Sequence, residues 1–96
     1  MVLRKCVVKM SLKPVNCTIT TFDFAAGYMV DVVDYPLEEE LEVYLHHWNY
    51  DGIKVHIFDI RKDELGYGGC GSLEEFIEGH LVYGRYIQDF ERKYFS

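Results

Sequence analysis

The sequence predicts an α+β domain in which a mainly antiparallel four-stranded sheet carries two packed helices, in the order β-β-β-α-β-α. Three observations lead to this fold class: short segments with alternating apolar residues, a helix-spaced apolar stripe after Pro36, and a capping box at Ser72 and Glu75. The chain has 96 residues, of which 49% are hydrophobic. We therefore expect one domain, residues 1–96, with a single core.

Four segments have the composition of strands. Residues 4–13 alternate apolar and polar side chains with the period of two that is typical of a half-buried strand. Residues 17–24 and 29–35 are rich in β-branched and aromatic residues, and turn residues separate them. A fourth strand is expected at residues 53–60.

Two segments have helical spacing. Pro36 stands at a favourable first helical position, and the apolar residues that follow recur on one arc of a helical wheel: Leu37, Leu41, Tyr44, Leu45 and Trp48. The second helix is expected to begin at Ser72 and to keep one apolar face through residue 94. Gly79 and Gly84 each weaken it by about 1 kcal/mol relative to alanine. We predict one long helix, which a kink near Gly84 would interrupt.

The segment GYGGCGS, residues 66–72, has the G-x-G-x-x-G spacing of dinucleotide-binding loops. Its context does not fit such a loop, because the preceding strand ends near Ile60 and acidic residues flank the glycines on both sides. We interpret the segment as a turn between a strand and a helix, where glycines allow positive φ angles.

The composition excludes several classes of function. The formal net charge is −6 and the pI is about 5.1, so nucleic acid and anionic membranes would repel the molecule as a whole. Three cysteines without a C-x-x-C pair favour free thiols in a reducing cytoplasm. No segment is apolar enough for a signal peptide or a membrane span. We expect a cytoplasmic protein.

No catalytic motif or set of metal ligands is apparent. Glu42 and His46 are four residues apart, which would place them on one face of a helix, but a third ligand is missing. Cys70 would lie near a helix N-terminus, although neighbouring carboxylates oppose thiolate formation. We expect neither a cofactor nor a metal and predict that the chain is not an enzyme; an enzyme that uses Cys70 or His46 is the least favoured alternative.

The charges are strongly segregated along the chain. Residues 14–84 contain fourteen acidic residues against Lys54, Arg61 and Lys62, a balance of −11. This creates a field of one sign over most of the domain. One interpretation of this acidic excess is that the helix dipole favours acidic residues in the first turn of a helix. The other interpretation is imitation of nucleic acid, which carries one charge per about 1.7 Å of duplex axis. The predicted partner-binding residues are Asp31, Asp34, Glu38, Glu39, Glu42, Asp63, Glu64, Glu74, Glu75 and Glu78.

Several segments resemble a domain of the ArdA-type antirestriction proteins, which are acidic DNA mimics of phages and plasmids. TITTFDFAAGYMVDVVDYP resembles the opening strand pair of the family, LEEELEVYL its acidic helix, GIKVHIFDI its next strand, and GSLEEFIEGH its next helix start. The similarity covers about residues 17–80. The family's proteins contain several such domains, whereas this chain has one. A single acidic domain is also similar in character to anti-CRISPR proteins.

The resemblance and the charge layout together imply an inhibitor encoded by a phage or a mobile element. We expect it to bind a defence nuclease, either a CRISPR effector or a restriction enzyme, as an acidic mimic of nucleic acid. The partner would be a basic nucleic-acid-binding surface, with no direct contact to nucleic acid or membrane. The alternative is a protein-interaction subunit without mimicry, for which a homodimer is one arrangement.

Overall fold

The computed structural model describes residues 6–10, 17–65 and 69–95. All five strands precede the two longer helices. The strands are β1 (Cys6–Met10), β2 (Thr18–Asp23), β3 (Tyr28–Asp34), β4 (Glu40–His47) and β5 (Val55–Arg61). The helices are a one-turn 3₁₀ helix η1 (Ala25–Gly27), the short α1 (Lys62–Leu65), α2 (Gly69–Tyr83) and α3 (Tyr86–Tyr94).

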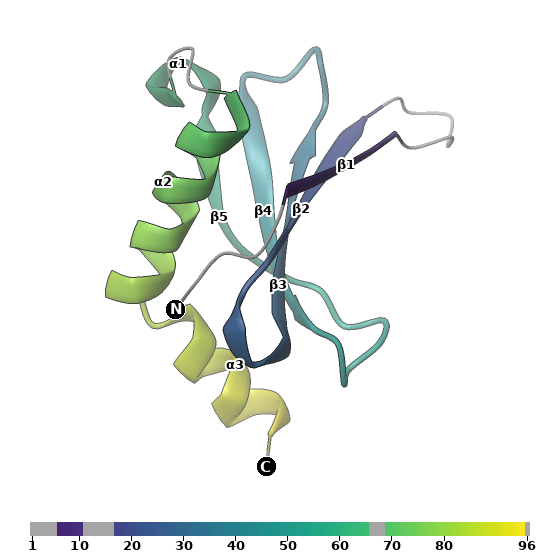
Figure 1. The fold of residues 1–96 in the computed structure, drawn as a ribbon, viewed down its shortest axis with the longest axis vertical. Coiled ribbons are helices and arrows are strands. Elements are labelled where there is room, and N and C mark those ends of the chain that lie inside the picture. Colours follow the sequence, from purple (N-terminus) through teal and green to yellow (C-terminus); the bar gives the residue numbers. More distant parts are fainter. Residues whose placement is uncertain (1–5, 11–16, 66–68, 96) are drawn as a thin grey trace.

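The strands form one antiparallel sheet in the order β1-β2-β3-β4-β5, so every strand pairs with its neighbours in the sequence. Helices α2 and α3 run along one side of this sheet (Figure 1). The β3–β4 turn and α1 lie at one end of the molecule, and the β2–β3 turn, the β4–β5 loop and the end of α3 lie at the other (Figure 1). The predicted α+β class and antiparallel pairing are confirmed.

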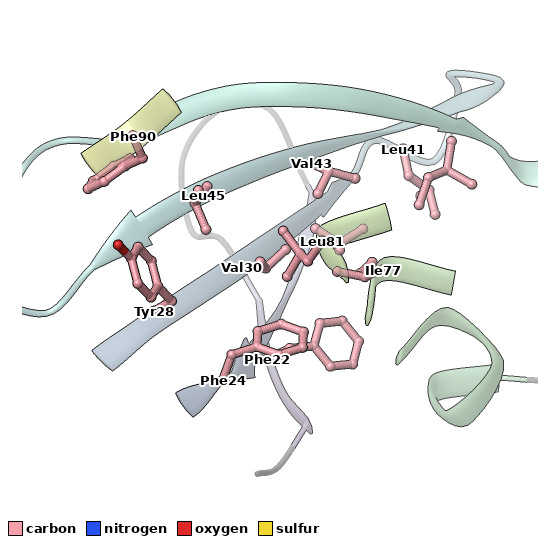
Figure 2. Close-up of a cluster of buried hydrophobic side chains, with 12 residues drawn as sticks. Phe22, Phe24, Tyr28, Val30, Leu41, Val43, Leu45, Ile77, Leu81 and Phe90 are labelled. Carbon is pink, nitrogen blue, oxygen red and sulfur yellow. The ribbon is translucent and has the colours of Figure 1, made fainter. Parts of the chain in front are cut away.

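The core fills the space between the sheet and the two helices. Phe22, Val30, Val43 and Leu45 point from β2, β3 and β4 toward Ile77 of α2, and each of these side chains has no exposed surface (Figure 2). Because side chains alternate across a strand, the residues between them face away from the helices. No helix of the described residues packs on that second face of the sheet (Figure 1).

The predicted helix over residues 36–48 is wrong, because this segment forms a turn and then strand β4. The same residues also alternate with a period of two, and the structure follows that period: Leu41, Val43, Leu45 and His47 are buried. As a strand, this segment pairs with β3 on one side and β5 on the other, and these pairings favour the strand over the helix. The element order is therefore five strands followed by helices, in place of β-β-β-α-β-α.

Pro36 has a different role from the predicted helix start. The amide of Glu38 donates to the carbonyl of Tyr35 at 2.9 Å, so residues 35–38 form a four-residue turn with proline at its second position. Leu37, expected in the apolar stripe, is 98% exposed at the tip of this turn.

The long C-terminal helix is divided at Gly84. The Gly84 amide donates to the carbonyl of His80 at 2.7 Å, and α3 begins at Tyr86. A Cβ atom at Gly84 would lie 2.6 Å from that carbonyl oxygen, so only glycine fits this bend. Helix α2 begins at Gly69, before the expected Ser72. Residues 66–68 of the glycine loop lie outside the described residues.

Candidate acidic protein-binding surface

The β3–β4 turn carries three consecutive glutamates to one end of the molecule. Glu38, Glu39 and Glu40 are all exposed. The turn is fixed on one side by its own hydrogen bond and on the other by α1, because the Lys62 amide donates to the Glu39 carbonyl at 3.0 Å. The glutamates therefore project from a backbone that is held in place.

Beside this turn lies an open hollow of about 1170 Å³. We call it the acidic hollow. Among the residues that the structure describes, five of the eight that line it carry a carboxylate, and none of the eight is lysine or arginine. The described lining residues are Tyr35, Pro36, Leu37, Glu38, Glu39, Glu40, Glu42 and Asp59. Arg61, opposite Glu40, and Lys62, which donates to the carbonyl of Tyr35, border the hollow and are paired with Asp63 and Asp34. A cationic group from a partner would therefore enter a predominantly acidic concave surface.

Two of these carboxylates sit directly opposite each other on neighbouring strands. Glu42 of β4 pairs in register with Asp59 of β5 on the helix-free face of the sheet. Like charges at opposed positions destabilise a sheet. Each has a local partner that offsets this effect: the Tyr44 hydroxyl donates to Glu42 at 2.7 Å, and His56 Nε2 lies 2.6 Å from Asp59.

The hydrogen bond between Tyr44 and Glu42 also affects the tyrosine. Together with partial burial and the negative charge of Glu42, it raises the pKa of Tyr44 to about 12. Tyr44 therefore stays a neutral donor throughout the physiological range.

Asp31 does not belong to this surface. Its side chain is 4% exposed and accepts hydrogen bonds from Thr21 at 2.8 Å, from His46 at 3.0 Å and from Lys54 at 2.6 Å. Burial alone would raise the pKa of Asp31, but these bonds outweigh it and hold that pKa well below its usual range. The carboxylate is ionised, and its charge is directed inward to a lysine and a histidine.

Two further predicted residues are paired with cations. Asp34 lies 2.7 Å from the ammonium of Lys62, which also donates to the carbonyl of Tyr35. Asp63 lies 3.1 Å from Arg61, and both side chains are largely exposed. Salt bridges of this kind neutralise charge locally and contribute little to stability. Neither acid presents a free carboxylate to a partner.

The remaining predicted acids are on the helices. Glu64 lies on α1, and Glu74, Glu75 and Glu78 lie on α2. Helix α2 packs on the opposite side of the sheet from Glu42 and Asp59, so these acids do not line the acidic hollow. Within the part of the chain that the structure describes, none of the four forms an ion pair with lysine or arginine.

The structure thus brings together Glu38, Glu39 and Glu42 of the predicted set, and it adds Glu40 and Asp59. Sequence reasoning missed Glu40 because it treated residues 36–48 as a helix, and it missed Asp59 because the place of that residue depends on the register of β5 with β4. The alternation Glu40-Leu41-Glu42-Val43 was the available signal, since it places both glutamates on one face of a strand.

The histidines considered for chemistry have partners inside the fold. His46 lies on β4 and is hydrogen-bonded to Asp31. Because Glu42 and His46 lie on a strand, they are not one helical turn apart as the sequence had suggested. His80 stacks between Phe58 and Phe76. Among residues 6–10, 17–65 and 69–95, no three His, Cys, Asp or Glu side chains converge as a metal would require. The side chain of Cys70 lies outside the described residues.

Comparison with known proteins identifies no relative: no family model matches the chain, and neither a curated protein nor a solved structure shows significant similarity to it. No helix in the described part of the chain is long and apolar enough to cross a membrane.

Proposed function

We propose that this chain is an inhibitor from a phage or a mobile element that binds a bacterial defence nuclease, a CRISPR effector or a restriction enzyme, and competes with nucleic acid for its basic groove. The observation that carries the proposal is the acidic hollow, where five carboxylates surround a concave surface and no lysine or arginine is among the described lining residues. A groove that evolved to bind phosphates would attract such a surface by the same long-range electrostatic steering.

The spacing of the carboxylates supports the comparison with nucleic acid. Alternate residues of a strand are about 6.8 Å apart and neighbouring strands about 4.8 Å apart, so Glu40, Glu42 and Asp59 form a compact array. Arg61 lies opposite Glu40 at the edge of this array and is paired with Asp63. At one charge per about 1.7 Å of axis, five carboxylates match roughly 8 Å of duplex, which is two to three base pairs. The surface would therefore imitate a short stretch of backbone.

The proposed contact surface lies on a different element from the one that the family resemblance suggested. The segment LEEELEVYL, compared with an acidic helix, contains strand β4. The surface is accordingly the β3–β4 turn and the adjoining edge of the sheet: Glu38, Glu39, Glu40, Glu42 and Asp59. The exposed Leu37 and the ring of Tyr35 at its border supply apolar contact area, which charge alone does not provide.

The test is competition with DNA. Purified guide-RNA-loaded CRISPR effectors and purified restriction enzymes are mixed with a fluorescent target duplex, and the chain is titrated in. We expect one of them to release the duplex in a stoichiometric manner. Raising the salt concentration should weaken the inhibitor–nuclease complex, because the contact is between opposite charges.

Two triple variants separate the proposal from a general effect of net charge. Glu38, Glu39 and Glu40 are replaced by glutamine in one variant, and Asp23, Asp51 and Asp89 by asparagine in the other. Both lose three charges, but only the first changes the acidic hollow. We expect at least a tenfold loss of inhibition in the first and little change in the second. Equal inhibition by the wild type and the first variant would refute the mimicry.

A further inference from the structure

Helix α2 has an outward face that carries a groove of about 460 Å³. The groove is lined by Glu75, Phe76, Gly79, His80, Tyr83 and Gly84. It lies on the other side of the sheet from the acidic hollow, so its role is independent of the proposed function.

The groove combines a protruding aromatic side chain with a gap in the helix surface. Tyr83 is 90% exposed, and the neighbouring Val82 is 55% exposed. One turn earlier, Gly79 has no side chain, and a Cβ atom built there would meet nothing within 4 Å. The ring of Phe76, tilted against the ring of His80, forms the apolar surface beside this gap.

These features are arranged symmetrically about Gly79. Glu75 precedes Gly79 by four residues and Tyr83 follows it by four, so all three lie near one line along the helix. At a rise of 1.5 Å per residue, Glu75 and Tyr83 are each about 6 Å from Gly79 along the axis. A two-fold axis through Gly79 would therefore bring Tyr83 of one copy over Glu75 of the other, and this contact would occur twice.

We infer that the occupant of this groove is a second copy of the same chain, with the two α2 helices crossing in antiparallel orientation at Gly79. The missing side chains at the crossing point let the two backbones approach closely. The ring of Tyr83 from each copy then covers Phe76 of the other, and its hydroxyl donates to the carboxylate of Glu75.

The face is complementary to itself in its hydrogen-bonding groups. Each copy offers one exposed phenolic donor and one carboxylate acceptor, and within the described residues neither Tyr83 nor Glu75 has a hydrogen-bond or ion-pair partner in its own chain. Hydrogen bonds to an ionised acceptor are the stronger kind. The interface is isologous, as closed two-fold dimers require.

The face is small, and weak, transient contacts are typical of interfaces of small area. Helix α2 has 15 residues and is about 22 Å long, so two crossed helices bury an area at the small end of specific interfaces. We expect a reversible dimer that is populated at protein concentrations on the order of 0.1 mM.

Sedimentation velocity of the wild-type chain between 10 µM and 1 mM tests this directly. We expect the average mass to rise from that of the monomer toward twice that value. Gly79→Leu fills the crossing point without strain, because the space around it is open, and it should keep the chain monomeric throughout. Tyr83→Ser should weaken the dimer at least tenfold, while Leu37→Ser, which removes an equally exposed apolar side chain elsewhere, should leave it unchanged.

A Gly79→Cys variant distinguishes this geometry from other modes of self-association. Two cysteines that face each other at a two-fold crossing lie within disulfide range, so mild oxidation should give a covalent dimer. Wild-type chain, which contains the native cysteines, and Leu37→Cys are the controls. A wild-type monomer at 1 mM, a Gly79→Leu variant that still dimerises, or a Gly79→Cys variant that cross-links no faster than the controls would each overturn the inference.

Discussion

Replacing Asp31 by asparagine changes a buried carboxylate that three other side chains share as their hydrogen-bond acceptor. The carboxylate accepts three hydrogen bonds, from β2, from β4 and from Lys54 just before β5, so it ties together strands that are not all neighbours. Asparagine keeps the size but loses the charge, and its amide group would face donors instead of acceptors.

The magnitude follows from these contacts. A hydrogen bond to a charged group contributes about 1.5–3 kcal/mol, and such contributions are not additive when they share one acceptor. The Lys54 side chain is half exposed, so its bond counts for less because water screens it. We therefore expect the free energy of unfolding to fall by about 2–3 kcal/mol. For a domain of this size, that lowers the melting temperature by roughly 10–20 °C.

The assay is urea unfolding followed by circular dichroism at several pH values. The folded-state pKa of Asp31 lies below its unfolded value, so the ionised cluster stabilises the native state above about pH 4. This contribution disappears as the pH falls through the folded-state pKa. The difference in stability between the wild type and Asp31→Asn should thus be full at pH 7 and shrink below pH 4.

The matched control is Asp51→Asn, which removes the same charge from an exposed loop position. We expect a change within about 0.5 kcal/mol for this variant. If Asp31→Asn is as stable as Asp51→Asn at pH 7, or if its destabilisation is independent of pH down to pH 2, the ion-pair cluster does not have the role assigned to it.

Three further predictions concern the core, a turn and a tyrosine. Leu45→Ala, at a fully buried site, should cost about 3 kcal/mol in urea unfolding, while Leu37→Ala should cost almost nothing; similar values for both would place the core elsewhere. Gly27→Ala should destabilise the chain and shift the emission of Trp48, because its φ is +82° and a Cβ would collide with the indole; Gly52→Ala, with φ of +84° and open space, should cost only about 1 kcal/mol and leave the emission unchanged. In spectrophotometric pH titrations of the wild type and Tyr44→Phe, the difference should be a tyrosine that ionises near pH 12, because burial and Glu91 raise the pKa of Tyr28 in both chains; the bond to Glu42 should be intact below pH 10 and be lost as the pH rises through about 12, and a difference that lies near pH 10 would contradict the bond.

The strands were predictable where their alternation had no competing period. Residues 17–24 and 29–35 were assigned to strands within one residue of β2 and β3 at each end. Residues 36–48 satisfied both a helical and a strand period, and local spacing cannot decide between the two. The decision comes from tertiary structure, because β4 pairs with β3 and β5 along its length, and an isolated sequence window does not contain that information.

For the acidic hollow, the sequence predicted that carboxylates would be exposed but not which of them would lie together. The acidic composition indicated that carboxylates would be exposed, and Glu38, Glu39 and Glu42 are indeed gathered at one hollow. The sequence could not show that Asp31 is neutralised, since its partners Thr21, His46 and Lys54 are brought to it by pairing across the sheet. Nor could it place Asp59 opposite Glu42, which depends on the register of β4 with β5.

The most direct test of the proposed function is the inhibition constant of the Glu38/Glu39/Glu40→Gln variant against a nuclease that the wild type displaces from DNA. The account predicts an inhibition constant at least ten times that of the wild type, with the Asp23/Asp51/Asp89→Asn variant close to the wild type. Inhibition that is the same for all three chains would contradict it.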